Sequence, residues 1–162
     1  MIVSNTSTLV LLAKIGCLEQ FIMISPPIEI PSQVKEESLF YPESYYALLI
    51  HKLITQGKIN VTKVEEKNIR IIMSQFRLDK GEAAAYVLFD SSKHKAILTD
   101  DGELIKLCKL QEVPFTCALG ALVRLYEKKV ITKEKTLEKI SQLQKIGRYS
   151  PKLIDYFKKE VQ

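Results

Sequence analysis

The side chains with the clearest chemical potential are acids and amides that follow short apolar segments. Asn5 comes shortly after the apolar pair at residues 2–3, and Asp100 and Asp101 follow the apolar stretch at residues 96–99. In an open parallel α/β sheet, ligands bind outside the carboxyl ends of the strands. We therefore expect these residues to share one sheet edge with polar residues at nearby helix starts. The candidate positions are Asn5, Thr6, Ser7, Glu36, Glu37, Glu82, Asp100 and Asp101.

Acidic residues gathered at one edge indicate a metal site. Several carboxylates in one crevice repel one another unless a cation lies between them, and Mg²⁺ and Mn²⁺ are hard ions that take oxygen ligands. Such a site can polarise a phosphodiester, activate a water molecule and stabilise the leaving oxygen. It requires no histidine base, and the only two histidines, His51 and His94, lie at no predicted strand end.

Each candidate acid also has a purely structural interpretation. Glu82 ends the sequence D-K-G-E, which has the spacing of a capping box at a helix start. Asn5 and Asp101 can cap the helices that follow them. Glu36 and Glu37 can lie on a solvated helix face. The residue types alone leave both interpretations open at these positions.

The elements that must position these residues alternate between short strands and longer helices. We predict strands at residues 2–3, 28–30, 59–64, 96–99 and 113–117. We predict helices at residues 9–15, 32–41, 45–56, 69–73, 79–91, 104–108 and 118–127. This alternation indicates βαβ units, so the expected fold class is a three-layer α/β/α domain with a short-stranded parallel sheet.

The last part of the chain is basic and is predicted to form two amphipathic helices. From Lys128 onward there are ten Lys or Arg residues against four Asp or Glu, whereas residues 1–127 carry a net charge of −1. We therefore predict a domain at residues 1–128 and a helical extension at 129–162 that packs on it or on a partner subunit. The charge favours a polyanion such as RNA as partner, and a solvated lysine-rich face is the alternative.

The composition is that of a soluble globular protein, with 46% hydrophobic and 27% charged residues. The three cysteines, Cys17, Cys108 and Cys117, form no CxxC pair, and we expect them to be reduced thiols. No apolar run approaches the roughly 20 residues that a membrane helix needs, and the start is too short and polar for a secretory signal. We therefore expect a cytoplasmic protein without a membrane partner.

Four blocks of sequence occur in an order that is typical of one protein family. They are I-V-S-N-T-S-T-L-V-L-L-A, I-E-I-P-S-Q-V-K-E-E, D-K-G-E-A-A-A-Y and A-I-L-T-D-D-G-E-L-I-K-L. Together they resemble the PIN-domain family across about residues 1–125. The later segment L-Q-K-I-G-R-Y-S-P-K-L-I-D-Y-F is similar to the tail of a PIN-like subgroup with a C-terminal helical extension. The resemblance implies a nuclease fold with an acidic metal pocket.

The resemblance also implies roles for individual residues. Asn5 stands where the first metal-binding aspartate of the family is expected, and Glu82 matches the third acid. Glu37 matches the second acid, with Glu36 as the alternate, and Asp101 matches the last. The implied metal ligands are Asn5, Glu37, Glu82, Asp100 and Asp101, with Glu37, Glu82 and Asp101 as catalytic residues. The implied cofactor is Mg²⁺ or Mn²⁺.

The function implied by the resemblance is that of a VapC-type toxin, an endoribonuclease that is inhibited by a small antitoxin protein and often forms a homodimer. Asn5 departs from the family pattern, because an amide oxygen can bind a cation but carries no charge. We expect weakened metal binding, with attenuated or absent catalysis. The alternative is a PIN-fold module that binds RNA or protein without efficient cleavage.

A phosphotransfer enzyme with an aspartate nucleophile is a third interpretation. It is disfavoured, because such an enzyme needs a carboxylate where the chain has Asn5. The neighbouring pair Asp100 and Asp101 is the one feature that keeps it open.

Overall fold

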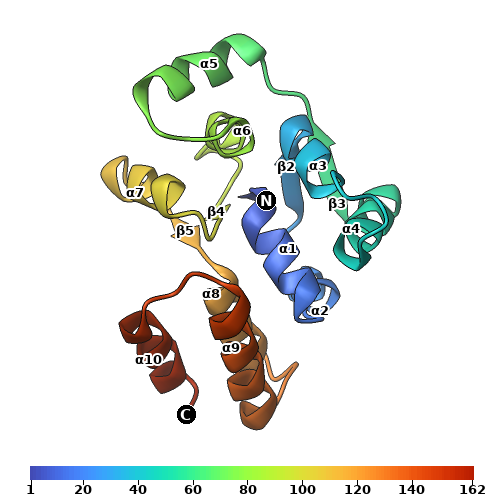
Figure 1. Cartoon of the computed structure of the whole chain (residues 1–162), viewed down its shortest axis with the longest axis vertical. Coiled ribbons are helices and arrows are strands. Elements are labelled where there is room, and N and C mark those ends of the chain that lie inside the picture. Colours follow the sequence, from blue (N-terminus) through green and yellow to red (C-terminus); the bar gives the residue numbers. More distant parts are fainter.

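The five predicted strands form one parallel sheet in the computed structural model, which describes all residues from 1 to 162 (Figure 1). The strands are β1 (Ile2–Ser4), β2 (Ile28–Pro31), β3 (Ile59–Thr62), β4 (Ile97–Leu98) and β5 (Phe115–Thr116). Their order across the sheet is β3-β2-β1-β4-β5, and all neighbours are parallel. The expected three-layer α/β/α architecture is confirmed.

Ten helices surround the sheet. They are α1 (Thr6–Lys14), α2 (Leu18–Ile24), α3 (Ser32–Ser38), α4 (Tyr45–Thr55), α5 (Glu66–Gln75), α6 (Lys80–Leu88), α7 (Gly102–Leu110), α8 (Ala118–Glu127), α9 (Lys133–Ile146) and α10 (Pro151–Glu160). The sequence did not predict α2, whose N-cap residue Cys17 makes no side-chain cap hydrogen bond. The prediction that α6 reaches Ser91 is wrong. Phe89 adopts an extended conformation and packs its ring near His94, which ends the helix.

Helices bury both faces of the sheet. Adjacent strand residues point to opposite faces, so each strand can contribute to the core on either side. Ile2 and Leu98 belong to a large core cluster formed with helices such as α1, α2, α4 and α8. Val3 and Ile97 belong to a second cluster formed with α5, α6 and α7. The helices on the two faces hold the short strands in register, so the loops after the strands have fixed positions.

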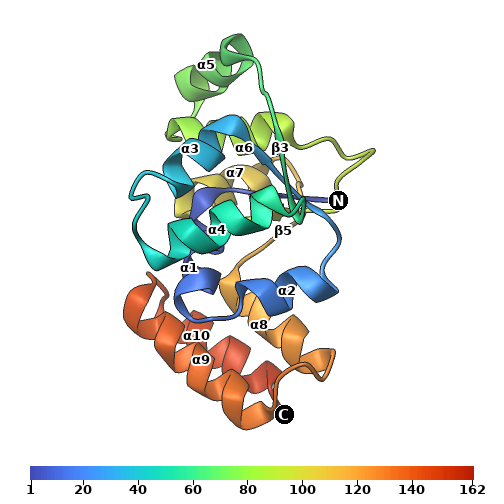
Figure 2. The ribbon, with the colours of Figure 1, turned by 90° about the vertical axis from the view of Figure 1, so that its right-hand side faces the viewer.

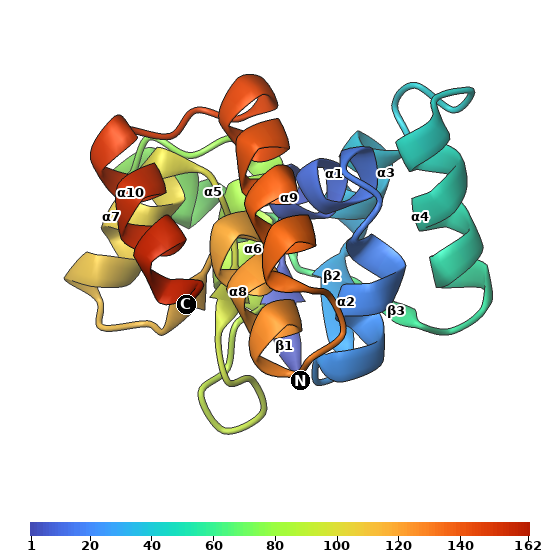
Figure 3. The same cartoon turned by 90° about the horizontal axis from the view of Figure 1, so that it is seen from below.

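The C-terminal arm, which we define as residues 129–162, contains α9 and α10 and packs on α8. Figures 2 and 3 show these three helices grouped together at one end of the molecule. Ile140, Leu143 and Ile154 of the arm are buried in the large core cluster. Lys139 Nζ also donates a hydrogen bond to the carbonyl oxygen of Ile15, at 2.5 Å. The arm is therefore packed against the same body that carries the sheet.

The strand order reverses between β1 and β4, which are neighbours in the sheet although far apart in the chain. Such a reversal creates a crevice at the carboxyl ends of the two strands. Asn5 follows β1 there, and Thr99, Asp100 and Asp101 follow β4. The topology thus brings the two chain segments predicted to carry the site to one place.

No single helix is both long and apolar enough to cross a membrane. Helices α1 and α2 reach the required length and composition only when taken together, and their axes bend by 116° at the break between them.

Candidate active site

Asn5 is buried at the end of β1, where its amide group joins two neighbouring segments. Its side-chain Nδ2 donates a hydrogen bond to Thr99 Oγ1 at 2.8 Å, and its Oδ1 accepts one from Ser7 Oγ at 2.9 Å. Only 2% of the residue is exposed. Asn5 occupies the N-cap position of α1, but its side chain makes no cap hydrogen bond. Both ends of the amide are therefore used to connect the loops after β1 and β4.

Asp101 and Glu82 each hold the start of a helix, as their spacing predicted. Asp101 is the N-cap of α7, and its Oδ2 accepts a hydrogen bond from the backbone N–H of Leu104 at 2.8 Å. Glu82 lies in the first turn of α6, and its Oε2 accepts a hydrogen bond from the backbone N–H of Asp79 at 2.9 Å. These contacts fix the two carboxylates in place before any ligand binds.

The Glu82 carboxyl is partly buried and lies beside Asp101. Burial is the main cause that raises the pKa of Glu82 to about 7, and the negative charge of Asp101 raises it further, against the lowering effect of the Asp79 N–H. Two acids that disfavour joint ionisation bind either a proton or a cation between them. A metal ion at this pair would therefore offset both the cost of burying the Glu82 carboxylate and its repulsion from Asp101.

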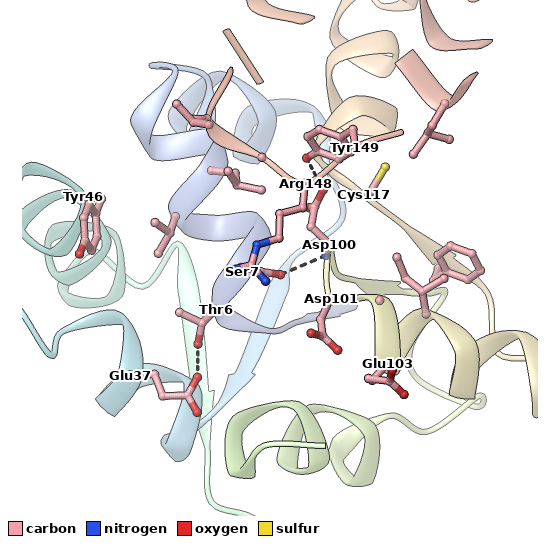
Figure 4. Close-up of a pocket in the computed structure, with 18 of the residues that line it drawn as sticks. Thr6, Ser7, Glu37, Tyr46, Asp100, Asp101, Glu103, Cys117, Arg148 and Tyr149 are labelled. Atoms are coloured by element: carbon pink, nitrogen blue, oxygen red, sulfur yellow. Dashed lines mark hydrogen bonds between the residues drawn. The ribbon is translucent and has the colours of Figure 1, made fainter. Parts of the chain in front are cut away.

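Glu37 reaches the same edge from α3. Its Oε2 accepts a hydrogen bond from Thr6 Oγ1 at 2.7 Å, drawn in Figure 4, and its Oε1 accepts one from the backbone N–H of Gly81 at 3.0 Å. Gly81 directly precedes Glu82, so Glu37 lies against the N-terminal turn of α6. A Cβ atom on Gly81 would lie 2.2 Å from Glu37 Oε1, which shows that this approach requires glycine. Its neighbour Glu36 is exposed and forms no side-chain hydrogen bond.

Asp100 has a different set of partners from Asp101. Its Oδ1 accepts hydrogen bonds from Thr8 Oγ1 at 2.5 Å and from the backbone N–H of Ala118 at 3.0 Å, and its Oδ2 accepts one from the hydroxyl of Tyr149. Burial raises the pKa of Asp100, and these hydrogen bonds oppose that effect. Both oxygens of Asp100 are engaged and its carboxyl is largely buried, whereas Glu37 is exposed and can still accept from water. We therefore assign Asp100 to holding α8 and the C-terminal arm.

The oxygen donors at this edge meet part of what a divalent ion requires. No three Asp, Glu, His or Cys side chains are arranged closely enough to hold a metal ion together. Mg²⁺ is commonly bound through one or two carboxylates and keeps several waters. The Glu82 and Asp101 pair meets that need, whereas the Asn5 amide is committed to Thr99 and Ser7. Four converging ligands, as the family pattern implies, are not formed.

Neither the neighbouring thiol nor the buried histidine supplies a nucleophile or base at this edge. The thiol of Cys117 lies close by, but burial is the main cause that raises its pKa to about 11, so it stays protonated. His94 is buried at the opposite ends of the strands, where its Nδ1 accepts a hydrogen bond from the backbone N–H of Asp90 at 3.0 Å. The carboxylates therefore carry whatever acid–base or metal chemistry the edge supports.

A cavity of about 1040 Å³ opens beside this edge, between the sheet and the C-terminal arm (Figure 4). Glu37 and Asp101 line one side of it, and Arg148 and Tyr149 of the arm line another. The sequence interpretation missed Arg148 and Tyr149 as site residues. The one signal for them was the break G-R-Y-S-P between two predicted helices, which places a cation and an aromatic ring in a loop.

The strand order and the acids that follow β4 are those of a PIN-like α/β/α domain, which is a nuclease-type fold. The model of the DUF3368 family, described as PIN domain, matches residues 1–162. The chain belongs to this PIN-domain family. No curated protein and no solved structure shows a significant match to it.

Replacing Gly81 by alanine should displace Glu37 without unfolding the protein. The new Cβ atom would meet the Glu37 carboxylate, which is the mobile end of a long side chain and can move away. The hydrogen bonds to Thr6 and to the Gly81 N–H would then be lost, at a cost of about 1 kcal/mol each. Urea unfolding and a crystal structure of the variant measure the two effects.

Gly102→Ala is the matched control, because Gly102 also lies in the first turn of a helix but a Cβ atom there meets nothing within 4 Å. It should leave stability unchanged or raise it by up to about 1 kcal/mol. Equal stability of the two variants, with Glu37 still in place, would contradict the role assigned to Gly81.

The raised pKa of Glu82 predicts a specific pH dependence of stability. The folded protein holds a proton on Glu82 up to about pH 7, whereas an unfolded Glu loses it near pH 4.5, so the contribution of Glu82 falls as pH rises through that window. Glu82→Gln should therefore gain stability relative to wild type between these pH values. Chemical unfolding in EDTA at several pH values tests this, and parallel curves for the two proteins would rule it out.

Proposed function

We propose that this protein is a divalent-metal-dependent endoribonuclease that hydrolyses RNA phosphodiester bonds. The observation that carries the proposal is the partly buried pair of Glu82 and Asp101 at the carboxyl edge of a PIN-type sheet. A Mg²⁺ or Mn²⁺ ion at such a pair supplies Lewis-acid polarisation of the phosphodiester and a water of lowered pKa. Membership of a PIN-domain family supports nuclease chemistry over other uses of an acidic pocket.

The acidic residues contribute to the proposed hydrolysis because backbone and side-chain hydrogen bonds hold their carboxylates in fixed positions. The Leu104 N–H fixes Asp101, and the Asp79 N–H fixes Glu82, so both carboxylates lose little side-chain entropy on binding an ion. Glu37 is clamped at the rim between a hydroxyl and a backbone N–H. From there its carboxylate can orient a water molecule and accept its proton.

The biological setting is part of the same proposal. We infer that the protein acts in the cytoplasm as the toxin of a toxin–antitoxin pair, as a homodimer inhibited by a small antitoxin protein. This rests on the resemblance of its sequence blocks to VapC-type proteins. Lysines of the C-terminal arm, which has most of the net positive charge, would contact RNA phosphates and position the strand without reading its sequence.

A module that binds RNA or protein without cleaving it is the second candidate. The burial of Asn5 favours it, because the neutral amide is built into the hydrogen bonds that shape the edge. The absence of a three-ligand metal cluster favours it as well.

The test of the proposal is cleavage of a labelled RNA panel by purified protein with Mn²⁺ or Mg²⁺. Asp101→Asn should reduce cleavage by roughly 100-fold or more, in the range expected when a positioned catalytic acid is lost. Asparagine remains a good helix N-cap, so α7 and the fold should be retained. Circular dichroism and thermal unfolding check that point on the same samples.

Glu103→Gln is the matched control, since Glu103 is an exposed acid beside the same cavity that pairs with Lys106 at 3.2 Å. It should cleave like wild type. Cleavage that is independent of added metal, or equal in Asp101→Asn and wild type, would refute the proposed enzyme.

Asn5→Asp separates the two candidate functions. If the asparagine is what limits catalysis, the variant should gain metal-dependent cleavage, because an added carboxylate strengthens cation binding. The same RNA panel measures this gain. Active wild type with a slower variant would instead show that the amide belongs to a working site.

A further inference from the structure

Aromatic rings from distant parts of the chain meet in the cavity beside the acid pair. The rings belong to Phe40, Tyr41, Tyr46, Phe115, Tyr149 and Phe157. A cavity with this lining favours a flat, unsaturated ligand, because aromatic faces stack well on one another. The ligand class must also suit an edge where phosphodiester chemistry is proposed.

Two of these rings are unusually open to solvent. Phe40 is 71% exposed and Tyr41 is 64% exposed, and they pack edge to face at a centroid distance of 5.0 Å. Rings left this exposed contribute little to the folded core, so the faces that their mutual contact leaves uncovered are free to stack on a ligand. Tyr46 is held more firmly, because Lys14 Nζ lies 5.3 Å from its ring centroid.

The arm brings an unpaired cation to the same cavity. Arg148 lies in the loop between α9 and α10, next to Tyr149, whose hydroxyl is bound to Asp100. The Tyr149 ring also packs closely on Gly147, where a Cβ atom would lie 2.3 Å from its Cε2. The loop is thereby anchored, and Figure 4 shows the Arg148 side chain directed toward Ser7 and Asp100. Arg148 forms no ion pair with any carboxylate of the chain.

Four carboxylates, those of Glu37, Asp100, Asp101 and Glu103, line the cavity with two cations, Lys109 and Arg148. None of these carboxylates forms an ion pair with Arg148, so its guanidinium is free to bind an anionic group. Asp101 belongs to the acid pair, where the metal ion of the proposed function would offset its negative charge. A neutral ring can enter the cavity, and an attached phosphate can reach the guanidinium of Arg148.

We propose that the cavity binds one unpaired nucleotide of single-stranded RNA, with its base on the rings of Phe40 and Tyr41 and its phosphate on Arg148. Aromatic stacking accepts any base, and a guanidinium binds phosphate oxygens in pairs. The inference rests on the proposed function and names the part of the RNA that this site grips. The nucleotide lies beside Asp101, so the site sets which phosphodiester reaches the acid pair.

The test is RNA binding in EDTA, where no cleavage takes place. Fluorescence anisotropy measures the affinity of a short labelled oligouridine RNA and of an abasic RNA of the same length. Phe40→Ala should weaken binding of oligouridine on the order of 10-fold and leave the abasic strand unaffected, because only stacking is lost. Arg148→Ala should weaken binding of both strands, since both keep the phosphate.

Tyr45→Ala and Arg70→Ala are the matched controls. Tyr45 is 67% exposed on α4 and Arg70 is exposed on α5, outside the C-terminal arm, and neither lines the cavity. Both controls should bind like wild type. All four substituted residues are exposed, so their replacement should not unfold the protein, and thermal unfolding confirms that for each sample.

The inference is overturned if wild type does not retain RNA, if the site variants bind like wild type, or if the controls lose as much affinity as the site variants. Its failure is distinct from failure of the proposed enzyme. Site-dependent binding without any cleavage would support the nucleotide site and leave the second candidate function. Metal-dependent cleavage, with RNA binding unchanged in Phe40→Ala and Arg148→Ala, would support the proposed enzyme and overturn the nucleotide site.

Discussion

The hydrogen bond from Asn5 Nδ2 to Thr99 Oγ1 is the contact on which the sheet edge depends, because it joins the two loops where the strand order reverses. Thr99 Oγ1 also accepts from the backbone N–H of Asp101 at 3.0 Å. On the other side, Ser7 Oγ donates to Asn5 and accepts from the backbone N–H of Asp100 at 3.0 Å. One buried amide thus orients the backbone of both aspartates. An aspartate at this position could join the same loops only by accepting from the Thr99 hydroxyl, so donor and acceptor would exchange places in this contact.

The side chains of the adjacent residues Asp100 and Asp101 consequently point to opposite sides of the sheet edge. Asp101 turns toward α7 and Glu82, where its charge takes part in the acid pair. Asp100 turns toward α8 and the arm, where Tyr149 covers it. Of these two neighbours, Asp101 belongs to the acid pair, and Asp100 holds α8 and the C-terminal arm in place. The cavity forms because Asp100 holds the arm close to Asp101.

Local patterns predicted the features that depend on local contacts. The strands, the Asp101 cap and the Glu82 contact at the start of α6 involve neighbours within a few residues, so spacing and residue type revealed them. Helix α2 was missed because its start carries no polar capping signal. The partners of Asp100, and the closing of the cavity by Tyr149, could not be read from the sequence, because they join segments that only the folded chain brings together.

The contact between Tyr149 and Asp100 also sets an order of events during protein synthesis. The two residues are 49 positions apart, and Asp100 leaves the ribosome first. At typical rates of about 5–20 residues per second, several seconds pass before the tyrosine follows. During that interval a nascent chain carries the carboxylate of Asp100 without the hydroxyl that covers it. The arm can close this side of the crevice only after Tyr149 has left the ribosome.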